Sequence, residues 1–79
     1  EKGMKADEAL EKGDSYQNAG DHANAIKQYD SAIKSDPNNA ETYIKRGNSK
    51  LARNDLKGAL KDFDKAIELK SGNAAWHVI

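Results

Sequence analysis

The chain has 79 residues, of which 33% are charged and 37% are hydrophobic, and its formal net charge is zero. This length allows one small domain, residues 1–79, and the balanced charge favours neither nucleic acid nor an anionic membrane as a partner. The sequence contains no cysteine, which excludes disulfides and thiolate metal sites. No apolar run approaches the length of a membrane span and no segment has the features of a signal peptide, so we expect a cytoplasmic protein.

The sequence repeats itself with a period of 34 residues. When residues 6–39 are laid over residues 40–73 without a gap, ten of the 34 positions are identical. The stretch "AIKQYDSAI", for example, returns as "ALKDFDKAI". A period of this size is typical of architectures in which copies of one supersecondary unit stack on each other. Residues 74–79 would then begin a third unit, as a partial repeat or a capping helix.

Each unit is predicted to form two helices. Taken in chain order, the predicted helices lie near residues 5–19, 22–35, 39–53 and 56–70, and a fifth begins near residue 73. The second helix of each unit carries its apolar residues at the spacing of one helix face. These residues are Ala25, Ile26, Tyr29, Ala32 and Ile33 in the first unit and Ala59, Leu60, Phe63, Ala66 and Ile67 in the second.

Turn residues separate the predicted helices. Gly20 would end the first helix, and Asp21 is a natural N-cap for the second. Asn54 and Asp55 do the same in the second unit. Pro37 excludes the helical conformation for the residue before it, so the second helix should end near residue 36.

Two glycines fall in the middle of predicted helices. Gly13 and Gly47 each cost about 1 kcal/mol relative to alanine there, a cost that a close approach of another backbone would explain. We expect Ala25 and Ala59 to lie opposite them. Tyr16, Tyr29 and Phe63 are then expected to fill the space beside these contacts.

These residues resemble the tetratricopeptide repeat. The first unit supplies Gly13, Tyr16, Ala25, Tyr29, Ala32 and Pro37 at the places of the family pattern, and the second supplies Tyr43, Gly47, Ala59, Phe63 and Ala66. Lys12 and Arg46 stand where the pattern has leucine, so we expect their stems to lie on apolar surface with the charged heads in water. Trp76 falls one place early for the large residue of a third unit.

The resemblance implies an all-α fold, an α-solenoid of antiparallel helix hairpins that form a right-handed superhelix. It also implies a protein–protein interaction module without catalytic activity, which holds a peptide segment of a partner in a concave groove lined by the first helix of each unit. The groove residues carried over from the family pattern are Leu10, Asp14, Gln17, Ile44, Asn48 and Leu51. Helical spacing supports this set independently, because each group of three shares one helix face. Leu10, Ile44 and Leu51 have the alternative of ordinary packing between helices, and Asn48 that of a plain exposed residue.

One branch of the family clamps acidic C-terminal tails with lysine and asparagine side chains. This chain has Leu10 and Asp14 at two of those places, and Asp14 would repel a carboxylate. We therefore do not expect a carboxylate clamp, although an anionic segment could still meet the basic second unit. Two other functions remain open. The chain could be a self-association module that uses an exposed C-terminal end, or a targeting arm of a larger multidomain protein or enzyme.

The sequence gives no sign of catalytic, cofactor or metal chemistry. The two histidines, His22 and His77, are far apart, and His22 falls in a turn where we expect it to be solvated. Asp62 and Asp64 point to different helix faces, so they do not form a catalytic carboxylate pair. The basic residues Lys45, Arg46, Lys50, Arg53 and Lys57 are interpreted as a solvated helix surface.

Charge is distributed unequally between the two units. Residues 6–39 hold seven acidic and three basic side chains, whereas residues 40–73 hold five acidic and eight basic ones. This asymmetry would favour head-to-tail or swapped contacts between copies of the chain.

Overall fold

The computed structural model describes residues 2–71, and within this range it consists of four helices and contains no strand. The helices are α1 (Lys2–Asn18), α2 (His22–Ser35), α3 (Ala40–Ala52) and α4 (Leu56–Lys70). Their bounds confirm the predicted ranges, with the largest difference at the start of α1. The fifth helix predicted near residue 73 lies outside the described residues.

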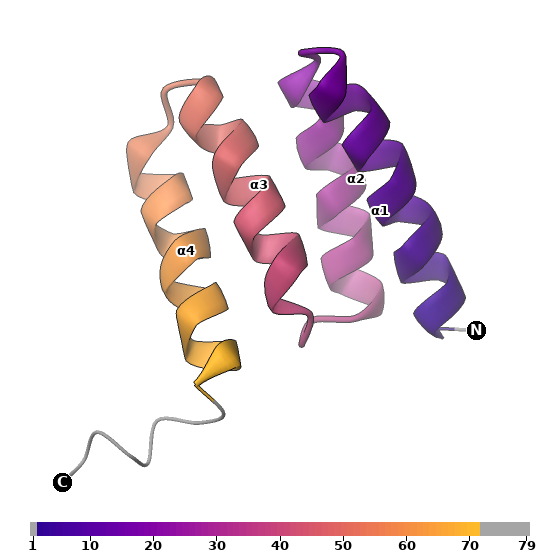
Figure 1. Ribbon diagram of the computed structural model, residues 1–79. Coiled ribbons are helices and arrows are strands. Elements are labelled where there is room, and N and C mark those ends of the chain that lie inside the picture. The colour runs from indigo at the N-terminus through magenta and orange to yellow at the C-terminus, as the bar shows by residue number, and fades with distance from the viewer. Residues whose placement is uncertain (1, 72–79) are drawn as a thin grey trace, which may run out of the picture.

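The helices form two antiparallel hairpins that lie side by side (Figure 1). α1 packs against α2, α3 packs against α4, and α2 packs against α3 to join the hairpins. α1 also touches α3. Each unit of the sequence repeat is therefore one hairpin, and the all-α hairpin fold is confirmed.

Both hairpin turns have the same geometry. Gly20 and Asn54 take positive φ values of 83° and 72°, the conformation that favours glycine or asparagine after a helix. In each turn the next backbone N–H, that of Asp21 or Asp55, returns to a carbonyl five residues earlier at 2.8 Å. The side chains of Asp21 and Asp55 then accept hydrogen bonds from the backbone of Asn24 and Gly58, which caps α2 and α4.

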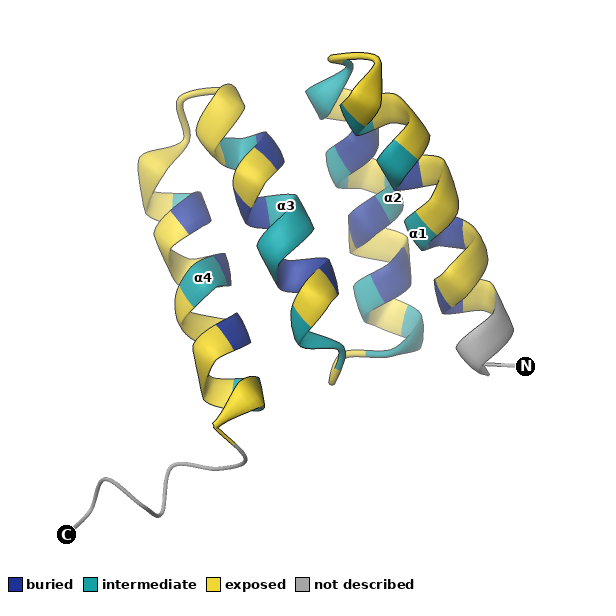
Figure 2. Cartoon of the chain, viewed as in Figure 1, coloured by how far each residue is buried: buried dark blue, intermediate teal, exposed yellow. Residues whose placement is uncertain are grey.

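The core lies along the hairpin interfaces and consists mainly of small residues (Figure 2). The buried hydrophobic residues are Ala6, Ala9, Ala25, Tyr29, Ala32, Tyr43, Ala59 and Ala66. Tyr29 is the largest residue with no exposed surface. The polar residues Thr42, Ser49 and Asp62 are buried as well. Small side chains let the helices approach closely, so a few aromatic rings fill the remaining space.

Aromatic rings are the nearest neighbours of the two mid-helix glycines. A Cβ atom on Gly13 would lie 2.5 Å from Cε1 of Tyr29, and one on Gly47 would lie 2.8 Å from Cε1 of Phe63. Tyr29 and Phe63 thus lie beside the glycines as predicted, and their rings come closer than Ala25 and Ala59. Tyr16, which was expected to fill the same space, is 38% exposed.

Candidate functional site

The candidate site is the surface shared by α1 and α3. We call it the α1/α3 face and define it by the six residues singled out from the sequence. Leu10, Asp14 and Gln17 lie on α1, and Ile44, Asn48 and Leu51 lie on α3. The members of the second group stand 34 residues after those of the first, so the two helices contribute equivalent positions.

An ion pair joins the two helices at this face. Nζ of Lys45 lies 2.9 and 3.0 Å from the two carboxylate oxygens of Asp14. The Tyr29 hydroxyl donates to the same carboxylate at 2.7 Å. Burial of the ring raises the pKa of Tyr29 well above its usual value, and the hydrogen bond to Asp14 acts in the same direction. Tyr29 therefore remains a neutral donor, and Asp14 is held in place from two sides.

Gln17 forms a second link between α1 and α3. Its Nε2 donates to the backbone carbonyl of Lys45 and to Oγ of Ser49, both at 2.9 Å. Its Oε1 accepts from the Tyr29 hydroxyl at 3.3 Å. The Ser49 hydroxyl also lies 3.1 Å from Nδ1 of His22. The amide of Gln17 is thus engaged within the chain. The expectation that His22 is merely solvated was wrong, because α3 lies against the start of α2.

The remaining residues of the face are less engaged. Leu10 and Ile44 are half-buried. Asn48 is exposed, and Leu51 is 48% exposed. Asn48 makes no side-chain hydrogen bond within the described part of the chain. Chemically, this part of the face offers one amide with both donors and acceptors beside aliphatic surface.

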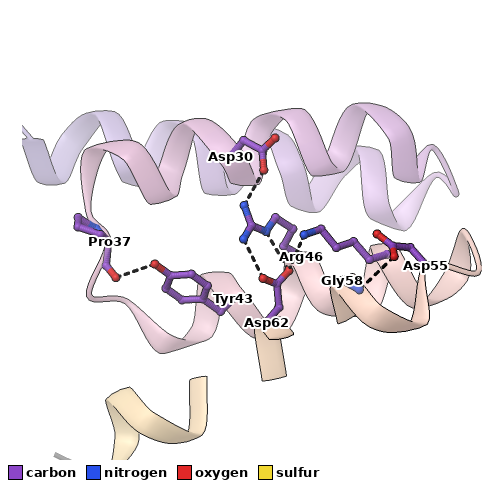
Figure 3. A network of polar contacts seen from close by, with 8 residues as sticks. Asp30, Pro37, Tyr43, Arg46, Asp55, Gly58 and Asp62 are labelled. Carbon is purple, nitrogen blue, oxygen red and sulfur yellow. Dashed lines mark hydrogen bonds and ion pairs between the residues drawn. The ribbon is translucent and has the colours of Figure 1, made fainter. Parts of the chain in front are cut away.

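A partly buried charge network joins α3 to α2 and α4 (Figure 3). Arg46 donates through Nε and Nη2 to the two carboxylate oxygens of Asp62 at 2.9 and 2.7 Å, and through Nη1 to Asp30 at 2.7 Å. Lys50 reaches Asp62 at 3.3 Å. The Asp62 side chain is only 5% exposed, so two cations compensate one buried carboxylate.

These ion pairs correct the sequence interpretation for Lys45, Arg46 and Lys50, whereas Arg53 and Lys57 are exposed as expected. The head of Arg46 was expected in water, but its side chain is only 19% exposed. The hydrogen bonds to Asp62 raise the pKa of Arg46, burial partly opposes this, and Asp30 adds a smaller increase. Lys45, Arg46 and Lys50 are therefore structural ion-pair partners and not a solvated surface. The expectation that Asp62 and Asp64 lie on different faces is confirmed, because Asp64 is exposed.

The opposite charges of the two units form ion pairs with each other within the chain. Asp14 and Asp30 of the acidic first unit pair with Lys45 and Arg46 of the basic second unit. Sequence reasoning missed both pairs, although the opposite charges of the units were visible. The register between the hairpins determines which acidic residue pairs with each basic residue, and this register could not be predicted from the sequence.

The described residues show no other kind of site. They contain no group of three His, Asp or Glu side chains placed to hold a metal ion. None of the helices within residues 2–71 is long and apolar enough to cross a membrane. Every buried side-chain nitrogen or oxygen within this range has a hydrogen-bond partner. The surface between α1 and α3 therefore remains the candidate.

Two stacked helix hairpins whose equivalent residues recur after 34 positions define a helical repeat protein. The family model of the tetratricopeptide repeat matches residues 10–74, and the chain belongs to this family. Such repeats are generally protein–protein interaction modules and non-catalytic scaffolds. A comparison with curated proteins found no match.

Proposed function

We propose that this chain binds a peptide segment of a partner protein on the α1/α3 face, which would be the concave side of the repeat. The observation that carries the proposal is the pair Asn48 and Leu51, which are exposed next to each other on α3 beside half-buried Ile44. Residues three apart on a helix are neighbours on its surface. A peptide that crosses this surface would meet both side chains at once.

The six residues of the face have different roles in this proposal. Asn48 and Leu51 contact the partner directly, and Ile44 and Leu10 form the apolar floor. Asp14 and Gln17 are positioning residues, because their polar atoms already bind Lys45 and Ser49 on α3. They fix the distance and register between α1 and α3, so the surface is formed before the partner arrives. A surface that is already ordered costs less entropy on binding.

The charges of the face indicate the chemistry of the partner segment. Lys45 is a cation at this face, and Asp14 neutralises it at 2.9 Å. A peptide carboxylate would have to displace Asp14 to reach it. We therefore expect a segment that is recognised by an apolar side chain against Leu51 and Ile44, and by backbone hydrogen bonds to the Asn48 amide.

The test is affinity capture from native lysate, read by mass spectrometry. The wild-type chain is compared with an Asn48→Ala/Leu51→Ala variant whose helical content is first shown to be unchanged by circular dichroism. Lys57→Ala/Leu60→Ala is a matched control, because these residues are also exposed and three apart, but on α4. We expect specific partners that the wild type and the control retain and the Asn48/Leu51 variant loses. Partners that survive the Asn48/Leu51 substitutions would contradict the proposal.

Self-association is the alternative function. The observation that favours it is the exposed apolar surface of α4, where Leu60 and Ile67 are 62% and 63% exposed. Two copies that met through this surface would remove it from water. Self-association predicts a molar mass that rises with protein concentration in sedimentation equilibrium. A peptide-binding module predicts a constant mass in the absence of its partner.

A further inference from the structure

Three exposed carboxylates border the α1/α3 face. Asp7 on α1 lies three residues before Leu10. Glu41 holds the equivalent place on α3, three residues before Ile44. Residues three or four apart are neighbours on a helix surface, so Glu11, four residues after Asp7, belongs to the same side of α1. All three acidic side chains are exposed, and none forms an ion pair within the described part of the chain.

The positive charge at this face is already neutralised. Nζ of Lys45 lies 3.0 and 2.9 Å from the two carboxylate oxygens of Asp14. Together with Asp7, Glu11 and Glu41, the face and its border therefore hold four carboxylates against one ammonium group within the described residues. The surface that faces a bound segment is thus negatively charged.

The other basic residues of the second unit lie elsewhere. Arg46 and Lys50 bind Asp62 on α4. Arg53 follows α3 and acts on the charge of Asp21 at the start of α2. The remaining lysines of this unit lie on α4. The positive charge of the second unit is therefore directed to α2 and α4, and an anionic segment would gain little from it on the α1/α3 face.

The fold gives a reason for only one of the three bordering acids. Glu41 lies in the first turn of α3, where an acidic side chain interacts favourably with the helix dipole. Asp7 and Glu11 lie past the first turn of α1. Like charges four residues apart on a helix repel each other, and a cation bound between them would remove this repulsion.

We propose that the segment bound on the α1/α3 face is basic, with lysine or arginine side chains against Asp7 and Glu41 and an apolar side chain against Leu51. This inference rests on the proposed function: the exposed amide and aliphatic groups define the site, and the carboxylates select its occupant by charge complementarity. α1 and α3 run in the same direction (Figure 1), so both acidic positions lie towards the start of the helices and Leu51 lies towards the end of α3.

This arrangement sets the spacing of residues in the segment. Glu41 and Leu51 are ten residues apart on α3, which is about 15 Å at a rise of about 1.5 Å per residue. An extended chain that follows α3 spans this distance with about four or five residues. The matching probe is a synthetic peptide with one leucine and a pair of lysines about four residues away on each side, so that it fits in both directions.

Binding is measured by fluorescence anisotropy of the labelled peptide, beside two counterparts in which glutamine or glutamate replaces the lysines. At low salt we expect the lysine peptide to bind about tenfold more tightly than the glutamate peptide, with the glutamine peptide between them. The difference should vanish near about 1 M salt, where charges are screened beyond about 3 Å.

Two variants assign the preference to the bordering acids. Asp7→Asn/Glu41→Gln should weaken binding of the lysine peptide about fivefold while circular dichroism stays unchanged. Asp64→Asn/Glu68→Gln is the matched control, because it removes the same charge from exposed positions on α4. This control should keep the wild-type affinity.

Two outcomes would overturn the proposal. One is a lysine peptide that binds no more tightly than the glutamate peptide, or does not bind. The other is an equal loss of affinity in the α4 control, which would mean attraction by net charge alone. Failure of the proposed function is detected separately, by the Asn48→Ala/Leu51→Ala variant. A partner that this variant loses, together with an absent lysine preference, would leave the α1/α3 face as the binding site and overturn only its basic occupant.

Discussion

Replacing Gly13 by alanine tests the packing between α1 and α2 most sharply. The new Cβ would lie 2.5 Å from Cε1, 2.8 Å from Cδ1 and 3.0 Å from Cζ of Tyr29. Tyr29 has no exposed surface, and its hydroxyl is held by Asp14 at 2.7 Å. The ring therefore has no free direction in which to move. The methyl group can be accommodated only if α1 shifts or the hydrogen bond to Asp14 breaks.

The expected loss of stability is the balance of three terms. Overpacking costs about 1–3 kcal/mol, and a strained or broken hydrogen bond adds about 0.5–1.5 kcal/mol. Alanine gains about 1 kcal/mol over glycine in the middle of a helix. We therefore expect Gly13→Ala to lower the free energy of unfolding by about 1–3 kcal/mol, which for a chain of this size lowers the melting temperature by about 4–8 °C per kcal/mol.

Urea unfolding followed by circular dichroism measures this change, and a double-mutant cycle identifies its cause. In a Tyr29→Leu background the ring is gone, so Gly13→Ala should be neutral or stabilising. A wild-type chain that Gly13→Ala leaves unchanged or stabilises would refute the packing argument. Equal losses in both backgrounds would show that the glycine is needed for a reason other than the tyrosine ring.

Three further predictions concern polar contacts. Arg46→Ala should lower the free energy of unfolding by about 2–3 kcal/mol, because among the described residues it leaves Asp62 with Lys50 alone as a cation partner. Urea titrations measure this loss, and adding Asp62→Ala should recover part of it. The Asp14–Lys45 pair is partly exposed, so a double-mutant cycle should give a coupling energy of about 0.5–1 kcal/mol that falls with added salt. The hydrogen bonds from Asn24 lower the pKa of Asp21 in the folded chain below its ordinary value of 3.8. The stabilisation of the folded chain by the Asp21 carboxylate should therefore be complete above pH 3.8 and disappear as the pH falls through the folded-state pKa. Asp21→Asn should keep the cap in thermal melts but remove this pH dependence, and an unchanged acid limb would contradict the assignment.

The helices were the part of the structure that the sequence predicted well. α2 and α4 have the predicted bounds, because Asp21 and Asp55 mark their starts by an N-cap and local turn residues mark their ends. α1 starts earlier than predicted, since its first turn contains no capping signal. Local chemistry decides where a helix begins and ends, and local chemistry is visible in a sequence.

Contacts between the units were not predictable in the same way. Arg46 occupies a position where the repeat has leucine, and its charged head was expected in water, but the head binds Asp30 and Asp62 on two other helices. The same holds for Gln17, whose partners Lys45 and Ser49 lie 28 and 32 residues away. A helix pattern identifies the face on which a residue lies, but it does not identify the residue opposite.

The sequence predicted the residues of the α1/α3 face, and the structure shows how these residues differ in exposure and hydrogen bonding. The family pattern assigned the groove to equivalent places in both units and so treats its residues alike: Leu10, Asp14, Gln17, Ile44, Asn48 and Leu51. Exposure and hydrogen bonding separate Asn48 and Leu51 from Asp14 and Gln17. The binding role of all six stays a prediction until a partner is known.

If the α1/α3 face binds the partner, a titration of the isotope-labelled chain with the segment of a captured partner will show it. Backbone amide shifts are followed by nuclear magnetic resonance. We expect the largest changes to cluster at Ile44, Asn48 and Leu51, with small changes along α4. Changes concentrated at Leu60 and Ile67, with α3 unaffected, would contradict it.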